Sequence, residues 1–334
     1  MTIKNKITEL LDIEFPVIMA PMFLVSNGEM LKSALKSGIA GVFPSLNYRK
    51  EDELKKMLKE LNEYKKYHPK GTYGVNLIVQ KTNPLYPIHL KICVEAKVPF
   101  YITSLGNPKE VIEQAHGYGA KVFCDVTNLE HAEKCASLGC DGFIAVGQGA
   151  GGHAGSYPLQ VLVPSLNKKF PAIPIIAAGG IADGAGILSI ISLGAEAVSM
   201  GTRFIASTEA IVSKEYKNAI VNSGMHDIVL TTRISGTPCT IINNPYAKTI
   251  GYTQNWIERM LSSSTIFKKY LKMLVQLKGM HQLEKSIKPG SYETLWCAGQ
   301  SVELIHDILS CEEIITRLKA EFTLAYIELQ QRLS

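Results

Sequence analysis

The sequence lacks the cysteine spacing of a metal centre or a disulfide framework. Its 7 cysteines are dispersed along 334 residues, and no two of them form a Cys-x-x-Cys pair, which excludes the usual zinc and iron–sulfur patterns. An odd number of scattered cysteines is typical of thiols in a reducing compartment. We therefore expect no metal site and a cytoplasmic protein.

Long apolar runs and clustered charges are also scarce. The longest apolar stretch, residues 173–199, is interrupted by Gly179, Gly180, Asp183 and Gly184 and does not predict a membrane span. Acidic residues early in the chain argue against a signal peptide. Despite a net charge of +5, the lysines form no continuous basic run, so neither a nucleic acid nor a membrane is expected as a partner. With 46% hydrophobic residues, the chain has the composition of a globular protein.

Eight short apolar runs alternate with helix-length segments. The runs are Pro16–Ala20, Ala40–Pro44, Thr72–Val79, Val98–Thr103, Lys121–Val126, Asp141–Val146, Pro174–Ala178 and Glu196–Met200. Each is nearly continuous in apolar character, which is typical of parallel strands covered on both faces. Eight βα units within roughly 200 residues predict an α/β fold of the (β/α)8 TIM barrel type. An open doubly wound sheet is the alternative, but the first crossover is not glycine-rich.

Five of the segments between the runs show helical patterns. They are Asn27–Ser37, Glu51–Lys65, Pro108–Gly117, Leu129–Leu138 and Asp183–Leu193. Asp183 is placed to cap its helix. Glycines at the ends of four helical segments suit left-handed C-caps: Gly38, Gly117, Gly139 and Gly194.

The βα rhythm stops after residue 207. We expect a smaller, mainly helical inserted cap domain over residues 208–290, with a short strand at Asp227–Thr232 and a basic amphipathic segment at Asn255–Leu277. Residues 1–207 and 291–334 would form the barrel. The last segment, Cys297–Leu333, predicts one or two long helices that pack back on the barrel.

A glycine-rich loop, residues 147–158, follows the sixth run and carries His153. Active sites of such barrels lie at the carboxyl ends of the strands, so this loop is expected at the site. Glycines allow close approach of the backbone to a ligand, and a histidine there can act as a base near neutral pH. A flexible loop with an incidental histidine is the alternative. The loop also fits a GxGxxG spacing, but it lacks the acidic residue of a dinucleotide fingerprint.

Glycine turns follow the seventh and eighth runs, at Gly179–Gly180 and Gly201–Thr202. Backbone N–H groups of such turns bind phosphate in many barrels, whereas two ordinary tight turns are the alternative. Asn76 lies inside the third run, where a buried amide needs partners from a ring cofactor or from neighbouring backbone. Asp125 ends the fifth run and could face the site or cap a turn.

These blocks resemble the nitronate monooxygenase family, formerly called 2-nitropropane dioxygenases, which also includes FMN-dependent enoyl-ACP reductases. The resemblance covers nearly the whole chain. Its blocks are Pro16–Met22, Gly74–Leu77, Ala150–Gly155, Ile175–Gly184, Met200–Phe204 and Trp296–Gln300. The order and spacing of AGGHxG, GGIADG and MGTRF carry the resemblance, because no single block is specific.

The resemblance implies FMN as the cofactor and His153 as the catalytic residue. It places residues 20–22 along the isoalloxazine ring, Asn76 at the edge of the ring, and the turns at 179–180 and 201–202 at the phosphate. The implied cofactor-binding positions are Ala20, Pro21, Met22, Asn76, Asp125, Val146, Gly151, Gly152, Ala178, Gly179, Gly180, Met200, Gly201, Thr202, Gly299 and Gln300. Gly149, Val146 and Asp125 stand where family members carry glutamate, glutamine and, in some members, lysine.

The implied function is that of an FMN-dependent oxidoreductase that oxidises alkyl nitronates or nitroalkanes with O2. The first alternative is an NAD(P)H-dependent enoyl-ACP reductase, for which the basic surface would suit an acidic acyl carrier protein. The second alternative is a flavin-binding protein without turnover. The expected partners are a small-molecule substrate and O2, and the oligomeric state stays open, a homodimer included.

Overall fold

The computed structural model describes residues 3–80, 82–233, 238–253 and 295–334. Eight parallel strands close into a barrel in the order β1-β2-β3-β4-β5-β6-β8-β9, and β1 pairs with β9 to complete the ring. The strands are β1 (Val17–Met19), β2 (Ala40–Pro44), β3 (Thr72–Ile78), β4 (Phe100–Ser104), β5 (Lys121–Val126), β6 (Gly142–Val146), β8 (Ile175–Ala178) and β9 (Ala197–Met200). All eight coincide with the predicted apolar runs, so the TIM barrel is confirmed and the open sheet is wrong.

Side chains that alternate along the strands fill the inside of the barrel. Phe100 and Ile102 of β4 belong to the inner cluster, whereas Tyr101 between them packs outward under the helices. Phe100 meets Phe123 edge to face at 5.8 Å. Helix α1 (Lys6–Leu11) contributes Ile7 and Leu11 to the same cluster. The interior is therefore a packed core, and the space for a ligand lies above the carboxyl ends of the strands.

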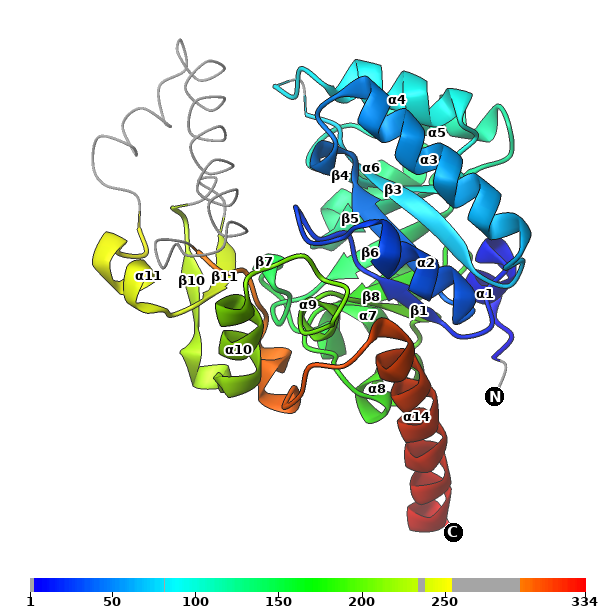
Figure 1. The fold of residues 1–334 in the computed structure, drawn as a ribbon. Coiled ribbons are helices and arrows are strands. Elements are labelled where there is room, and N and C mark those ends of the chain that lie inside the picture. The colour runs from blue at the N-terminus through cyan, green and yellow to red at the C-terminus, as the bar shows by residue number, and fades with distance from the viewer. Residues whose placement is uncertain (1–2, 81, 234–237, 254–294) are drawn as a thin grey trace.

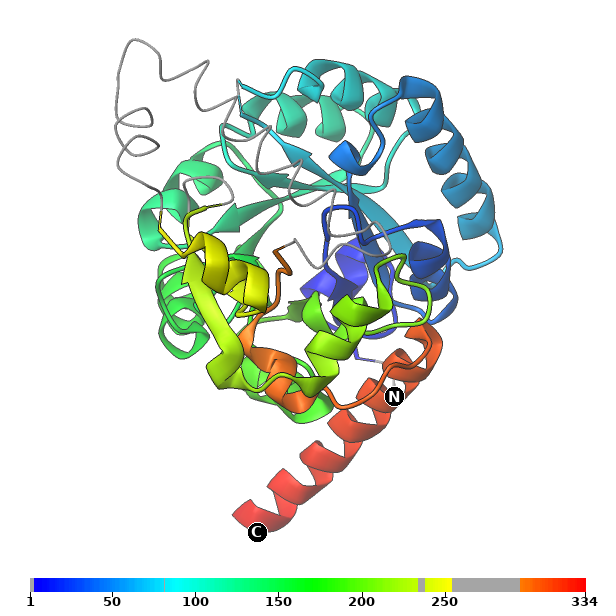
Figure 2. The same cartoon turned by 60° about the vertical axis from the view of Figure 1, so that its left-hand side comes forward.

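A ring of helices surrounds the strands (Figure 2). They are α2 (Gly28–Lys36), α3 (Glu51–Lys66), α4 (Tyr86–Glu95), α5 (Lys109–His116), α6 (Leu129–Ser137), α7 (Leu159–Lys169) and α8 (Gly184–Ser192). The five predicted helices are confirmed, while α4 and α7 were not predicted. Asp183 caps α8 as expected, because its Oδ1 accepts a hydrogen bond from the N–H of Gly186 at 2.7 Å.

Three of the four predicted left-handed glycines are confirmed, and one is wrong. Gly38, Gly139 and Gly194 have φ of +73°, +82° and +99°. Gly117 has φ of −55° and stays right-handed. The chain makes one more turn after α5, in which the N–H of Gly119 donates to the carbonyl oxygen of His116. The left-handed residue is therefore Gly119, with φ of +87°.

The described residues after 207 contain helices and a small antiparallel sheet. Helix α9 (Thr202–Ile205) ends the barrel before this point. The elements that follow residue 207 are α10 (Lys214–Asn222), the 3-10 helix η2 (Met225–Asp227), β10 (Ile228–Thr231), β11 (Cys239–Ile242) and α11 (Pro245–Ile250). The predicted strand at 227–232 is confirmed as β10. The third strand of this sheet is β7 (Gly152–His153), which belongs to the loop after β6. The segment 255–277 lies outside the described residues, and the division into barrel and inserted domain stays a prediction.

The chain ends in a short 3-10 helix, η3 (Gln300–Leu304), and a long helix, α14 (Cys311–Leu333). Helix α14 packs against α8 as predicted, and its last turns extend past the barrel (Figure 1). The approach is close, since a Cβ on Gly184 would lie 2.0 Å from the backbone nitrogen of Phe322. None of the helices in the described part of the chain combines the length and the apolar character needed to cross a membrane.

Candidate active site

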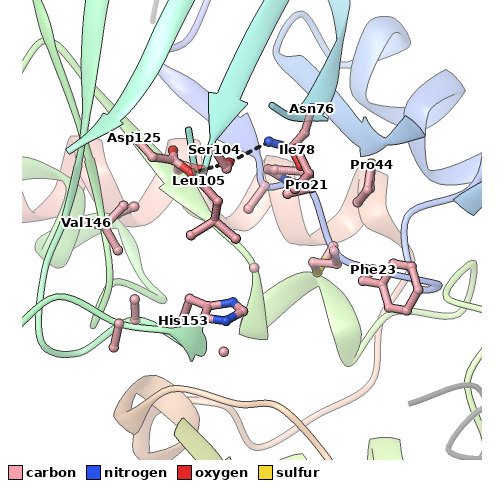
Figure 3. A pocket seen from close by; sticks show the side chains of 18 of the residues that line it. Pro21, Phe23, Pro44, Asn76, Ile78, Ser104, Leu105, Asp125, Val146 and His153 are labelled. Atoms are coloured by element: carbon pink, nitrogen blue, oxygen red, sulfur yellow. Dashed lines mark hydrogen bonds between the residues drawn. The ribbon is translucent and has the colours of Figure 1, made fainter. Parts of the chain in front are cut away.

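A cavity of about 1500 Å³ opens over the carboxyl ends of the barrel strands (Figure 3). It is lined by His153 and by all but two of the predicted cofactor-binding residues. The predicted cofactor residues that line it are Ala20, Pro21, Met22, Asn76, Asp125, Val146, Gly151, Gly152, Ala178, Gly179, Gly180, Met200, Gly201 and Thr202. Gly299 and Gln300 do not line the cavity. Reading the residues that follow each strand, together with the resemblance to the family, therefore located this cavity.

Bare backbone forms one side of the cavity. Gly179 has φ of +120°, and a Cβ there would lie 2.6 Å from the nitrogen of Ala150. A Cβ on Gly151 would lie 2.8 Å from the nitrogen of Gly299. The N–H of Gly180 donates to the carbonyl oxygen of Gly149 at 3.0 Å. Only glycine permits these backbone segments to pack against one another.

Gly299 supports this glycine surface from behind. Its N–H donates to Oγ1 of Thr202 at 3.1 Å, and it touches the backbone of residues 149–151. Gln300 begins η3 and is exposed. Gly299 thus fixes the position of cavity residues without facing the cavity.

Two glycines of this surface border open space. Gly152 and Gly180 both have φ of +73°. A Cβ on Gly152 would meet no described atom within 4 Å, and a Cβ on Gly180 would meet only the Cα of Gly149, at 3.9 Å. A ligand can therefore approach the backbone closely at both positions. The N–H of Gly180 already donates to the carbonyl oxygen of Gly149. A phosphate would therefore be bound mainly by the other backbone N–H groups of the turns at residues 179–180 and 201–202.

His153 projects into the cavity from β7 (Figure 3). Its backbone pairs with Cys239 of β11. The side chain is exposed to the cavity, and the protein groups packed around it lower the pKa of His153 below the usual 6.5 by desolvation. The imidazole is consequently neutral near pH 7 and can accept a proton.

A strip of three polar side chains, which we call the polar wall, crosses the ends of β3, β4 and β5 (Figure 3). Nδ2 of Asn76 donates to Oγ of Ser104 at 2.8 Å and to the carbonyl oxygen of Ile102 at 3.2 Å. The hydroxyl of Ser104 donates to Oδ2 of Asp125 at 2.5 Å. Burial raises the pKa of Asp125 to about 6, although the hydrogen bond from Ser104 works in the opposite direction.

Sequence reasoning missed several residues that line the cavity. They include Phe23, Arg49, Ser104, Leu105, His131 and Tyr216. Ser104 could have been found by the rule used for the other strands, because β4 ends one residue later than predicted. His131 and Arg49 lie farther along the chain than the residues directly after a strand, so inspection of the strand ends could not find them.

The cavity over the strand ends of this TIM barrel combines bare backbone with a few polar side chains. This is the architecture of an enzyme that acts on small molecules. The chain belongs to the nitronate monooxygenase family, whose model matches residues 4–321. The family consists of flavin-dependent oxidoreductases, and this membership confirms the resemblance seen in the sequence.

Relatives and solved structures extend this finding. A (3aS,4S,5R,7aS)-5-hydroxy-7a-methyl-1-oxo-octahydro-1H-indene-4-carboxyl-CoA dehydrogenase of Rhodococcus jostii is 24% identical, with 96% of each chain covered. A probable nitronate monooxygenase of Staphylococcus aureus is 29% identical over 73% of this chain and 79% of its own. The structure of FabK from Thermotoga maritima has a TM-score of 0.84 and 31% identity, covering 99% of this chain and 100% of that one. A nitroalkane oxidase of Streptomyces ansochromogenes shares the fold, with a TM-score of 0.80. It is 22% identical, and the match covers 97% of this chain and 100% of that one.

Proposed function

We propose that this protein is an FMN-dependent monooxygenase that oxidises alkyl nitronates and nitroalkanes with O2. Family membership supports the class of chemistry. The observation that carries the proposal is the position of His153, a histidine with a lowered pKa that reaches into a glycine-lined cavity. A neutral base facing a ligand cavity is what removal of a weakly acidic C–H proton requires.

The residues present fit FMN. The cavity, at about 1500 Å³, exceeds the several hundred Å³ of an ordinary ligand pocket and has room for cofactor and substrate together. The backbone at Gly179–Gly180 and Gly201–Thr202 would hold the phosphate, since a terminal phosphate needs N–H donors and close approach. Residues 20–22 and the polar wall would hold the ring. When bound, FMN would supply the oxidation of the substrate and the reaction with O2.

The protein's own part in the reaction is proton transfer and positioning. A ring nitrogen of His153 would take the proton from the carbon that carries the nitro group. The C–H bond breaks, an N–H bond forms on the imidazole, and the electron pair moves onto the nitro group to give the nitronate. The pairing of β7 with β11 holds the backbone of His153 in place for this step.

The test is the variant His153→Asn. We expect the variant to fold and to retain FMN, because the change leaves the backbone pairing of β7 untouched. Anaerobic bleaching of the flavin by a neutral nitroalkane should slow by roughly two to four orders of magnitude, the usual contribution of a positioned base. Bleaching by the pre-formed nitronate, which has already lost this proton, should slow much less.

The ratio of the two rates distinguishes the roles of His153. An equal fall in both rates would show that His153 binds or orients the substrate. No fall in either rate would show that the substrate class is wrong. A preparation that binds no FMN would remove the whole proposal.

A second candidate is an FMN- and NAD(P)H-dependent enoyl-ACP reductase. The observation that favours it is the similarity to FabK over 99% of the chain. An acyl carrier protein would be the partner only in this case. Rapid anaerobic bleaching by NADH or NADPH, with no response to a nitronate, would select this function over the first.

A further inference from the structure

The polar wall has no hydrogen-bond donor left to offer a ligand. The carbonyl oxygen of Ile102 can only accept, so the hydrogen bond to it fixes the orientation of the Asn76 amide, and the second N–H is used on Ser104. The Ser104 hydroxyl accepts a hydrogen bond from that N–H and donates its own hydrogen bond to Oδ2 of Asp125. What remains on the wall are two acceptors, Oδ1 of Asn76 and Oδ1 of Asp125.

Nothing in the described part of the chain neutralises this concentration of acceptors. No described residue hydrogen-bonds to either remaining oxygen. Around Asp125, β4 presents the hydroxyl of Ser104, and α6 presents the Cys135 thiol, whose pKa is raised by its hydrogen bond with Cys124, by burial and by the charge of Asp125 itself. The two basic side chains of α6 that line the cavity have other partners: Lys134 pairs with Glu130 at 2.7 Å, and His131 hydrogen-bonds Thr127 at 3.1 Å. The other titratable side chains that line the described cavity are Arg49, Cys124, His153, Tyr216, Cys239 and Cys297, and none of them contributes to the pKa shift of Asp125, which comes from burial and from the hydrogen bond with Ser104.

The ring edge of a flavin does not match a wall made only of acceptors. That edge carries a single N–H, and its other polar atoms are carbonyl oxygens and ring nitrogens, which accept. The N–H can satisfy one of the two oxygens. The other oxygen would face an acceptor with water excluded, which is as unfavourable as an unsatisfied buried polar group. One added proton on the wall removes the conflict.

We propose that Asp125 holds the flavin ring edge as a neutral carboxylic acid, donating from Oδ1 while Oδ2 keeps its hydrogen bond from Ser104, so that cofactor binding takes up one proton. The inference rests on the proposed function, because it assumes that the cavity binds a flavin. Burial supports this inference, because it raises the pKa of Asp125 to about 6. The free-energy cost of protonating Asp125 near neutral pH would therefore lower the affinity for the flavin only modestly.

The experiment measures flavin binding to the full chain after its own flavin has been removed. Riboflavin is the probe, because it lacks the phosphate of FMN, which titrates near pH ~6 and would obscure the result. Binding is followed by the fluorescence of the ring from about pH 6 to about pH 8.5. The dissociation constant of the wild type should rise by up to about tenfold per pH unit above pH ~6, as expected for uptake of one proton. Calorimetry in two buffers of different ionisation enthalpy should show uptake of close to one proton at about pH 8.

The variant Asp125→Asn carries a permanent donor at this position. Its riboflavin affinity should be nearly independent of pH, with no proton uptake, and at about pH 8 it should bind up to about a hundredfold more tightly than the wild type. Asp52→Asn, the same change at an exposed residue of α3, is the matched control and should behave as the wild type does. His153→Asn should keep the pH slope, which would exclude His153 as the source of the titration.

The outcomes separate the two proposals. The role of Asp125 would be overturned if the wild type bound riboflavin independently of pH and without proton uptake, whether or not the variant folds. This outcome would leave the proposed function as a flavin enzyme standing. Weaker binding by Asp125→Asn at every pH would overturn it as well. Failure of the wild type to bind either riboflavin or FMN would overturn the proposed function together with this inference.

Discussion

A matched pair of substitutions at Gly180 tests where the cofactor phosphate binds. Gly180 has φ of +73°, a conformation that asparagine and aspartate adopt more readily than other non-glycine residues. A Cβ there would meet only the Cα of Gly149, at 3.9 Å. Both Gly180→Asn and Gly180→Asp should therefore fold at a similar loss of stability, on the order of 1 kcal/mol. The two variants differ only in one negative charge at the entrance to the proposed phosphate site.

That charge sets the expected magnitude. Two unit charges ~5 Å apart in surroundings with an effective dielectric constant of ~20 repel one another by about 3 kcal/mol. FMN should accordingly bind Gly180→Asp about a hundredfold more weakly than Gly180→Asn. Riboflavin, which lacks the phosphate, should bind the two variants alike. The assay is a fluorescence titration of each flavin at low salt, and equal affinity of the two variants for FMN would refute the placement of the phosphate.

Two further predictions concern stability, measured by denaturant unfolding of the flavin-free protein. Gly184→Ala should destabilise the fold by about 2–4 kcal/mol, because the new methyl group would collide with the backbone nitrogen of Phe322 where α14 crosses α8. The control is Gly28→Ala, which should leave the free energy of unfolding nearly unchanged, because its methyl group would meet Met57 at an ordinary 3.4 Å. Burial raises the pKa of Asp125 from the ordinary 3.8 of the unfolded chain to about 6, so the folded state binds the proton more tightly. The wild type should therefore lose up to about 3 kcal/mol of stability as the pH rises between these values. Asp125→Asn should lack this loss, and an unchanged pH dependence in the variant would contradict it.

The barrel was predictable because its strands are buried on both faces. Burial of this kind selects continuous apolar runs, such as Ala40–Pro44, in which every residue is buried. The two helices that were not predicted show why the remaining elements are harder. Helix α7 contains Pro164, a residue that usually interrupts a helix, and α4 begins at Tyr86–Pro87 and buries His89. Tertiary packing overrides these local signals.

The site was predictable where it depends on strand ends and not where it depends on distant contacts. The carboxyl ends of parallel strands converge, so Asn76, Asp125 and Gly179 come together wherever their strands pair. The placement of Gly299 against Gly151 joins segments far apart in the chain. No local pattern encodes such a contact, and the resemblance to the family was the only signal for Gly299.

The loop that carries His153 is held by the segment that follows the barrel strands. Oγ1 of Thr240 in β11 donates to the carbonyl oxygen of Ala150 at 2.5 Å, and β11 pairs with β7 along Gly152 and His153. Tyr216 of α10 stacks on Trp296 at 5.6 Å and donates its hydroxyl to the carbonyl oxygen of Cys297.

This arrangement separates the two parts of the site physically. The polar wall belongs to the barrel strands, whereas the position of His153 depends on β11, and the glycine surface is supported by Gly299. Changes in β11 can therefore move His153, which we propose as the base, while the strands that carry the polar wall stay as they are.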